Sequence, residues 1–221
     1  MGSVTRIPDY YQITECTESY FERLGDSSLG MGWPNIPDAR RRFQVMLDVF
    51  RPEDRVKPAT PVRLLDLGCG TGHLYQYLRD SGSKDIEYAG IDLSEKFIQT
   101  ARSRHPEACF RQLDVLRDGL GSERFDYVVI NGVFTSRCAM SFEVMWEFVQ
   151  NLTTFAFQHA DQGIAFNAMS KHVDWERDDL FHLPLDLLAS FICRSMTRNF
   201  VIRNDYGLYE FTTYVYRERI L

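Results

Sequence analysis

An acidic residue and three alternating glycines lie close together in residues 64–74, which read Leu-Leu-Asp-Leu-Gly-Cys-Gly-Thr-Gly-His-Leu. Glycine allows a positive φ angle, or the close approach of a ligand to the backbone. The pattern predicts a buried strand, a tight turn and a helix that starts near Thr71. The free N–H groups and the positive dipole end of that helix would face a bound ligand. The candidate site residues of this turn are Asp66, Gly68, Cys69, Gly70 and Gly72.

Acidic or amide residues also follow the next predicted strands. Asp92, twenty residues after Gly72, follows a strand over residues 86–91. A carboxylate at this position can accept hydrogen bonds from both hydroxyls of a ribose. Asp114 and Asn131 follow two further strands. Because ligands of open α/β sheets bind outside the carboxyl ends of the strands, these residues predict a nucleoside site.

The residues of the turn discriminate between two classes of nucleoside ligand. A nicotinamide or flavin dinucleotide site uses the pattern Gly-x-Gly-x-x-Gly/Ala, whose third small residue lets the helix approach the strand. Counted from Gly68, that third place is His73, which is too large. Asp66 would also repel a pyrophosphate. A carboxylate there suits a ligand with cationic groups, such as an α-ammonium and a sulfonium.

Four segments in this order resemble the class I S-adenosylmethionine-dependent methyltransferases. They are Asp66-Leu-Gly-Cys-Gly-Thr-Gly72, Gly90-Ile-Asp-Leu-Ser94, Leu113-Asp-Val115 and Phe125-Asp-Tyr-Val-Val-Ile130. The resemblance covers roughly residues 60–170 and implies S-adenosyl-L-methionine as the cofactor. It implies that the glycine turn, including Cys69, lies against the methionine part of this cofactor. It also implies that Asp66 meets the ammonium group.

Roles for the later residues also come from the resemblance. Asp92 would hold the ribose hydroxyls, and Leu93 would pack on the adenine ring. Asp114 would accept a hydrogen bond from the adenine amino group, while the backbone of Val115 would contact the ring edge. The residues expected to border the methionine and the sulfonium are Asn131 and Gly132. A structural alternative for Asp114 is the N-cap of a short helix.

Strands and helices alternate from residue 62 to residue 196, which is typical of a doubly wound parallel sheet. The predicted strands are residues 62–67, 86–91, 108–113, 125–131 and 163–168, and the predicted helices are 71–80, 94–104, 140–159 and 185–196. Two strands, 199–204 and 210–217, follow with a link too short for a parallel crossover, so they are expected to pair as an antiparallel hairpin. The predicted fold class is α/β, a doubly wound seven-stranded sheet, mostly parallel with an antiparallel C-terminal hairpin strand.

The N-terminal part of the chain is expected to form a helical cap. Residues 9–24 and 38–50 have helical patterns, and the stretch between them is rich in glycine and proline, which break long elements. We expect a single methyltransferase-like domain over residues 1–221. Residues 1–58 would be its helical extension or lid, and residues 59–221 its Rossmann-like core.

Acidic residues outnumber basic ones, and the formal net charge is −6. Because nucleic-acid binding usually requires a basic surface, a small-molecule substrate is favoured. No apolar run reaches the length of a membrane span, and the N-terminus lacks the apolar core of a signal peptide. These features predict a cytoplasmic monomer or homodimer with no membrane or nucleic-acid partner. The five cysteines and five histidines lack metal-ligand spacing, so no metal is expected.

Methyl transfer from a sulfonium is an in-line displacement that mainly needs position, orientation and a dry pocket. A general base is needed only if the acceptor loses a proton. Aromatic and histidine residues near both ends of the chain are expected to line the acceptor pocket. The candidate catalytic residues among them are Tyr11, His172 and Tyr209. Residues 131–134 lack the two prolines of nucleobase amino-methyltransferases, which favours a small molecule, as in secondary metabolism.

Three classes of function are compatible with these residues. The leading prediction is methylation of a small molecule. The second is a cyclase or lyase with the same fold, in which the amino group of S-adenosylmethionine attacks its own γ-carbon, giving azetidine-2-carboxylate and methylthioadenosine. The third is a binding module that holds the cofactor without turnover. The products formed from S-adenosylmethionine alone would separate the three.

Overall fold

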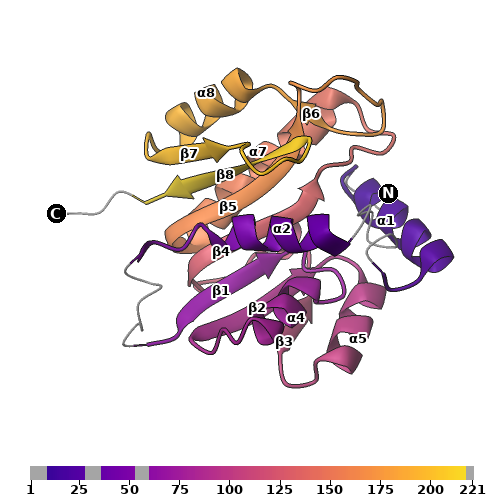
Figure 1. The fold of residues 1–221 in the computed structure, drawn as a ribbon, viewed down its shortest axis with the longest axis vertical. Helices are drawn as coiled ribbons and strands as arrows, with labels where there is room; N and C mark the ends of the chain where they lie inside the picture. The colour runs from indigo at the N-terminus through magenta and orange to yellow at the C-terminus, as the bar shows by residue number, and fades with distance from the viewer. Residues whose placement is uncertain (1–8, 28–35, 53–59, 218–221) are drawn as a thin grey trace, which may run out of the picture.

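The computed structural model describes residues 9–27, 36–52 and 60–217. Its centre is a sheet with the strand order β3-β2-β1-β4-β5-β8-β7 (Figure 1). β1 to β5 run parallel, whereas β8 is antiparallel to both β5 and β7. The strands are β1 (Val62–Leu67), β2 (Ile86–Asp92), β3 (Cys109–Gln112), β4 (Phe125–Phe134), β5 (Ala160–Ser170), β7 (Phe200–Arg203) and β8 (Glu210–Tyr216).

This architecture confirms the predicted fold class. The chain direction across the sheet reverses at β1, which has β2 on one side and β4 on the other. Such a topological switch point is where open α/β sheets bind their ligands. The sequence pattern does not predict one further strand, β6 (His182–Leu183), which pairs with the end of β5. Two residues are too few to produce a recognisable pattern.

Helices cover both faces of the sheet. α7 and α8 contribute to an apolar core on one face, and α2, α4 and α5 contribute to a second core on the other. Figure 1 shows α2 and α4 in front of the sheet and α7 behind it. The helices are α1 (Tyr11–Leu24), α2 (Ile36–Leu47), α4 (His73–Asp80), α5 (Glu95–Arg104), α6 (Val115–Asp118), α7 (Phe142–His159) and α8 (Leu185–Ser195).

Local sequence explains where two of the site helices begin. Ser94 is the N-cap of α5, and its hydroxyl accepts a hydrogen bond from the backbone N–H of Phe97. α4 begins at His73, two residues later than the pattern predicts, because Gly72 adopts a left-handed conformation at its N-cap. Both helices therefore start directly beside the carboxyl ends of β1 and β2.

The helix α1 lies beside the carboxyl ends of the strands (Figure 1). It follows the predicted helical segment closely, and α2 begins two residues before the predicted one. The predicted boundary between extension and core, at residues 58 and 59, lies outside the described residues. Within those residues, no helix is long and apolar enough to cross a bilayer.

Candidate active site

A cavity opens at the carboxyl ends of β1, β2 and β4. Its volume is about 1050 Å³, including the space at its open mouth. The sheet topology thus brings together side chains that are far apart in the sequence. All but one of the predicted cofactor residues line this cavity: Asp66, Gly68, Cys69, Gly70, Asp92, Leu93, Asp114, Val115, Asn131 and Gly132.

The glycine turn approaches β4 so closely that it leaves no space for a side chain. At Gly68, where φ is 84°, an added Cβ would lie 2.3 Å from Cγ2 of Val133. Gly70 also has a positive φ, of 54°. Both conformations favour glycine. The turn therefore lines the cavity with exposed backbone rather than with side chains.

Gly72 is the predicted cofactor residue that does not line the cavity. An added Cβ at Gly72 would lie 3.0 Å from the ring of Phe110 and 3.2 Å from that of His105. This third glycine is required because α4 starts there and packs against those two rings. The fold gives this glycine a packing role, and its approach to the methionine part of a cofactor stays a prediction.

Asp66 is a buried carboxyl group in the wall of the cavity. Its Oδ2 accepts a 2.7 Å hydrogen bond from the hydroxyl of Tyr88. Burial raises the pKa of Asp66 to about 7, although the bond from Tyr88 acts in the opposite direction. A nearby cation would lower this pKa again, because it stabilises the charged form. The site thus favours a ligand that presents a positive group to Asp66.

Asp92 connects the first two loops of the site. Its Oδ2 accepts a 2.9 Å hydrogen bond from the backbone N–H of Gly70, and its Oδ1 accepts one of 2.8 Å from that of Ser94. Burial raises the pKa of Asp92, and these two bonds oppose the shift. An ionised carboxylate has about four acceptor positions. A third hydrogen bond, from the backbone N–H of Leu93, also lowers this pKa, and the carboxylate keeps acceptor capacity for ligand hydroxyls beyond these three bonds.

Asp114 has more hydrogen-bond partners than either of the other two acids. Its Oδ1 accepts from the backbone N–H groups of Leu116 and Arg117, so it is the N-cap of α6. The hydroxyl of Tyr10 donates to Oδ2 at 2.8 Å, and that of Tyr11 donates to the same atom at 3.0 Å. The structural alternative for Asp114 is thus present in the fold. The two tyrosines hold the start of α1 at the cavity.

The end of β4 presents a polar side chain whose oxygen can still accept a hydrogen bond. Asn131 lines the cavity and is 8% exposed, and its Oδ1 has no hydrogen-bond partner within the described parts of the chain. A buried acceptor left without a partner is costly, so this oxygen is suited to a ligand donor. The next backbone N–H, of Gly132, donates a 2.7 Å hydrogen bond to Oδ1 of Asn167 on β5.

A buried ion pair lies behind Asn167. Nε of Arg42, on α2, is 2.8 Å from Oε1 of Glu210, on β8, and the Glu210 side chain is 1% exposed. Burial raises the pKa of Glu210, while Arg42 and the side chain of Asn167 both lower it. These contacts connect α2 to the reactive edge of the cavity. Sequence reasoning missed all three residues, because no local pattern links positions so far apart.

The three predicted catalytic residues do not line the cavity. The hydroxyl of Tyr11 is bonded to Asp114, and its ring faces Tyr10. His172 is exposed in the loop after β5. Tyr209 is 50% exposed, and its ring lies 5.5 Å from that of Trp175. The catalytic roles of these three residues stay predictions, for which the lining of the cavity gives no support.

The segment after β5 bends away from the cavity for a physical reason. Nδ1 of His182 lies 2.8 Å from the carbonyl oxygen of Ser170, and its Nε2 accepts from the backbone N–H of Arg177. These bonds fold the segment onto the end of β5. Tyr206 is likewise buried, with its hydroxyl 3.0 Å from that of Thr212. The side chain of Tyr206, one of the aromatic residues near the C-terminal end, is therefore part of the packing.

The remaining wall of the cavity comes from α1, in the N-terminal extension whose aromatic residues were expected at the acceptor pocket, and from α7, to which sequence reasoning assigned no such role. Tyr10, Ile13, Thr14 and Thr17 at the start of α1 line it, as does Phe148 of α7. The rings of Tyr10 and Phe148 are stacked, with centroids 5.0 Å apart. The helical pattern of residues 9–24 and the aromatic residues within it are the sequence signals for this wall, and neither shows where the helix lies.

Known proteins with similar sequences are methyltransferases. Residues 65–156 match the model of a family described as a methyltransferase domain. Rv1506c of Mycobacterium tuberculosis, provisionally named a methyltransferase, is 30% identical over 163 residues, which are 72% of this chain and 96% of that protein.

Two solved structures share the fold. Magnesium protoporphyrin IX methyltransferase from Synechocystis PCC 6803, crystallised with S-adenosylmethionine, has a TM-score of 0.62 at 16% identity, covering 98% of this chain and 100% of that one. The plantazolicin methyltransferase BpumL, in complex with S-adenosylhomocysteine, has a TM-score of 0.61 at 14% identity, covering 96% and 95%.

The sheet order, the glycine turn and the cavity at the switch point define an α/β domain of the methyltransferase type. The chain belongs to the class I S-adenosylmethionine-dependent methyltransferases, whose cofactor is S-adenosyl-L-methionine.

Proposed function

We propose that the protein transfers the methyl group of S-adenosyl-L-methionine to a small molecule. The observation that carries this proposal is the convergence of Asp66, Asp92 and Asn131 on one cavity beside a turn of bare backbone. When bound, the cofactor would supply an electrophilic methyl group on a sulfonium. The protein's own residues would bind, orient and desolvate the reactants.

The residues present fit this cofactor in three respects. The backbone turn at Gly68 and Gly70 leaves space where side chains are excluded. Asp66, whose pKa is about 7 in the empty protein, is suited to an ammonium group. Asp92 has unused acceptor positions for the ribose hydroxyls, and we assign it that role. Leu93 and Val115 line the cavity where the adenine ring would lie.

The unpartnered oxygen of Asn131 supports a position for it beside the reacting atoms. Its neighbour Gly132 is held by Asn167, so the end of β4 is fixed before a ligand binds. A fixed wall favours methyl transfer because the reaction depends chiefly on alignment of the acceptor with the methyl group. His73 is a histidine in the cavity wall, and its Nε2 lies 3.1 Å from Oδ1 of Asp26, which favours an acceptor that is nucleophilic without a general base.

Charge and relatives both favour a small acceptor. The net charge of −6 gives no basic surface for nucleic acid. Two structural neighbours are methyltransferases of magnesium protoporphyrin IX and of plantazolicin. We therefore place the acceptor among small molecules of biosynthesis, in a protein that acts in the cytoplasm without a membrane or nucleic-acid partner.

Product analysis tests this function. The protein is incubated with S-adenosylmethionine alone and with pools of small-molecule extract, and the nucleoside products are separated by chromatography. We expect S-adenosylhomocysteine that forms only when an acceptor is added. Methylthioadenosine formed without any acceptor would contradict methyl transfer and support the intramolecular cyclisation. Binding of the cofactor with neither product from any pool would indicate a binding module.

A further inference from the structure

The N-terminal helix α1 and the residues next to it contact all three loops of the cofactor site. At the C-terminal side of α1, Oδ1 of Asp26 lies 2.8 Å from the hydroxyl of Thr71, in the loop after β1, and 3.1 Å from Nε2 of His73, at the start of α4. Asp26 also forms an ion pair with Arg104. We call a set of contacts that holds α1 or its neighbouring residues to the cofactor site an anchor, and the contacts of Asp26 form the first of three.

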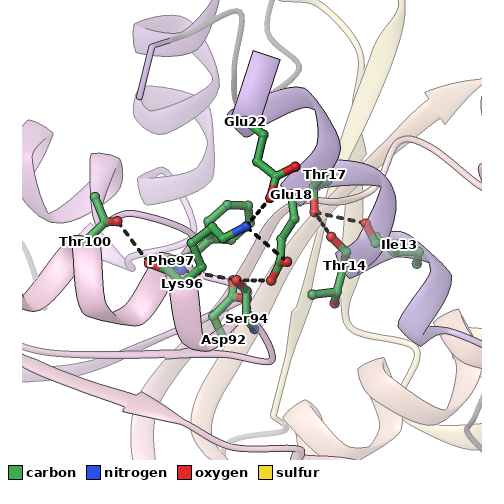
Figure 2. A network of polar contacts seen from close by, with 10 residues as sticks. All are labelled: Ile13, Thr14, Thr17, Glu18, Glu22, Asp92, Ser94, Lys96, Phe97 and Thr100. Atoms are coloured by element: carbon green, nitrogen blue, oxygen red, sulfur yellow. Dashed lines mark hydrogen bonds and ion pairs between the residues drawn. The ribbon is translucent and has the colours of Figure 1, made fainter. Parts of the chain in front are cut away.

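The second anchor joins the middle of α1 to the loop after β2. Figure 2 shows Glu18 and Glu22 pointing from α1 toward Ser94 and Lys96. The hydroxyl of Ser94 donates a 2.5 Å hydrogen bond to Oε1 of Glu18, and Nζ of Lys96 lies 2.5 Å from Oε1 of Glu22. Ser94 also donates its backbone N–H to Asp92, so α1 touches the immediate neighbour of the proposed ribose ligand.

The third anchor is on the loop after β3, where the hydroxyls of Tyr10 and Tyr11 donate to Asp114. Asp114 also accepts from two backbone N–H groups of α6, which makes four donors in all. A carboxylate has about four acceptor positions, so this one is fully used. An adenine amino group can reach Asp114 only by displacing a donor.

Among the four donors, only the tyrosines are able to leave. The backbone donors belong to α6 itself, which packs on α7. α1, by contrast, has no buried side chain. Its ion pairs with Lys96 involve side chains that are 30 to 63% exposed, and exposed pairs of this kind add little stability. The helix is therefore the wall of the cavity that is least costly to move.

We propose that α1 is a lid whose tyrosines and the adenine of the cofactor compete for Asp114. In the empty protein, Tyr10 and Tyr11 occupy the carboxylate and hold α1 across the cavity. Entry of the cofactor displaces at least one hydroxyl, and the anchors at Asp26 and Glu18 guide the helix back over the bound ligand. This inference rests on the proposed function, because it takes Asp114 as the ligand of the adenine amino group.

The test removes the two hydroxyls and keeps both rings. The double variant Tyr10→Phe/Tyr11→Phe is compared with Tyr20→Phe, a matched change on the same helix, where the ring of Tyr20 lies under the guanidinium of Arg23. The readouts are the association rate of S-adenosylhomocysteine in stopped-flow experiments and the deuterium exchange of α1 amides in the empty protein. We expect the α1 amides of the double variant to exchange faster. We expect S-adenosylhomocysteine to associate on the order of tenfold faster, because a smaller fraction of the molecules has α1 closed over the cavity. Tyr20→Phe should match the unaltered protein.

An association rate in the double variant equal to or below that of the unaltered protein would overturn the competition. Unchanged amide exchange in α1 would overturn the lid, because the hydroxyls would then not hold the helix. Failure of the unaltered protein to bind S-adenosylhomocysteine would instead overturn the proposed function, and the exchange measurement would still decide whether the tyrosines hold α1.

Discussion

The two N-terminal helices attach to the sheet in opposite ways. α2 buries Ala39, Phe43, Val45 and Met46 in the apolar core on one face. Its carbonyl at Val45 also accepts a 2.6 Å hydrogen bond from the hydroxyl of Tyr214 on β8. α1 buries no side chain and is held by hydrogen bonds and ion pairs to the loops of the cavity. One helix is part of the core, and the other rests on the site.

This difference divides the N-terminal extension into two functional parts. Burial of apolar side chains is the main source of stability, while exposed ion pairs contribute little. α2 therefore remains in place as a permanent wall, and we infer that only α1 moves. The expectation of a lid over residues 1–58 stays a prediction, and the burial of α2 in the core favours α1 as its moving part.

The largest expected effect is the loss of a core contact of α2. Met46 is 1% exposed, so Met46→Ala should lower the free energy of unfolding by about 2 to 5 kcal/mol through a cavity in the core. Ile13→Ala on α1, where the side chain is only partly buried, should cost less than about 1 kcal/mol. Urea unfolding measures both. Equal costs for the two changes would contradict the division between the helices.

The next largest effect on stability is expected from the buried ion pair between Arg42 of α2 and Glu210 of β8. Arg42→Met leaves the Glu210 carboxylate buried without its cation and should destabilise the protein by about 3 kcal/mol. Adding Glu210→Gln to Arg42→Met removes the uncompensated charge and should recover much of that loss. Thermal unfolding of the two variants is the measurement. No recovery in the double variant would show that the charge is not the cause.

The carboxyl group of Asp66, on the sheet side of the cavity, should titrate near neutral pH. Burial raises the pKa of Asp66 from 3.8 to about 7, so its folded form favours the proton. The stability it contributes to the empty protein is full below its unfolded pKa and is lost as the pH rises through about 7. Binding of an ammonium needs the carboxylate, so affinity for S-adenosylmethionine should increase several-fold from about pH 5.5 to 7.5.

Two variants distinguish Asp66 from other titrating groups. Asp66→Asn should remove the pH dependence of affinity. Tyr88→Phe deletes the hydrogen bond that stabilises the Asp66 carboxylate. The midpoint of the change in affinity with pH should therefore move to higher pH. Calorimetric titrations across the pH range give these midpoints. An unchanged pH profile in Asp66→Asn would assign the titration to another group.

The smallest expected effect concerns the second anchor of α1. Glu22→Gln removes an exposed ion pair with Lys96 and should leave the free energy of unfolding nearly unchanged. The same change should speed deuterium exchange in α1, and added salt should reduce the difference, because exposed charges are screened. A loss of several kcal/mol would mean that α1 is integrated into the core like α2.

The strands and the cofactor loops were predictable because their signals are local. The run at residues 62–67, the turn at Gly68 and the acids Asp66 and Asp92 each follow a strand that the pattern itself marks. Parallel strands end at one edge of a sheet, so their terminal residues meet without any knowledge of distant contacts. This is why nearly all of the predicted cofactor residues line one cavity.

The rest of the site depends on contacts that no local pattern carries. Tyr10 meets Asp114 across 104 residues, and Asn167 meets Gly132 across 35. His172 and Tyr209 looked available for chemistry because their segments are polar and aromatic. The segment that carries His172 is folded onto the end of β5 by the bonds of His182 to the backbone of Ser170 and Arg177. Residue types alone do not show that direction.

The central claim is that the cavity holds S-adenosylmethionine through Asp92. The most direct test is calorimetric titration of the cofactor into the unaltered protein, into Asp92→Ala and into Asp186→Asn, an exposed acid at the start of α8. We predict binding in the unaltered protein and in Asp186→Asn, and a loss of affinity on the order of a hundredfold in Asp92→Ala. Near-normal affinity in Asp92→Ala would contradict this account of the site.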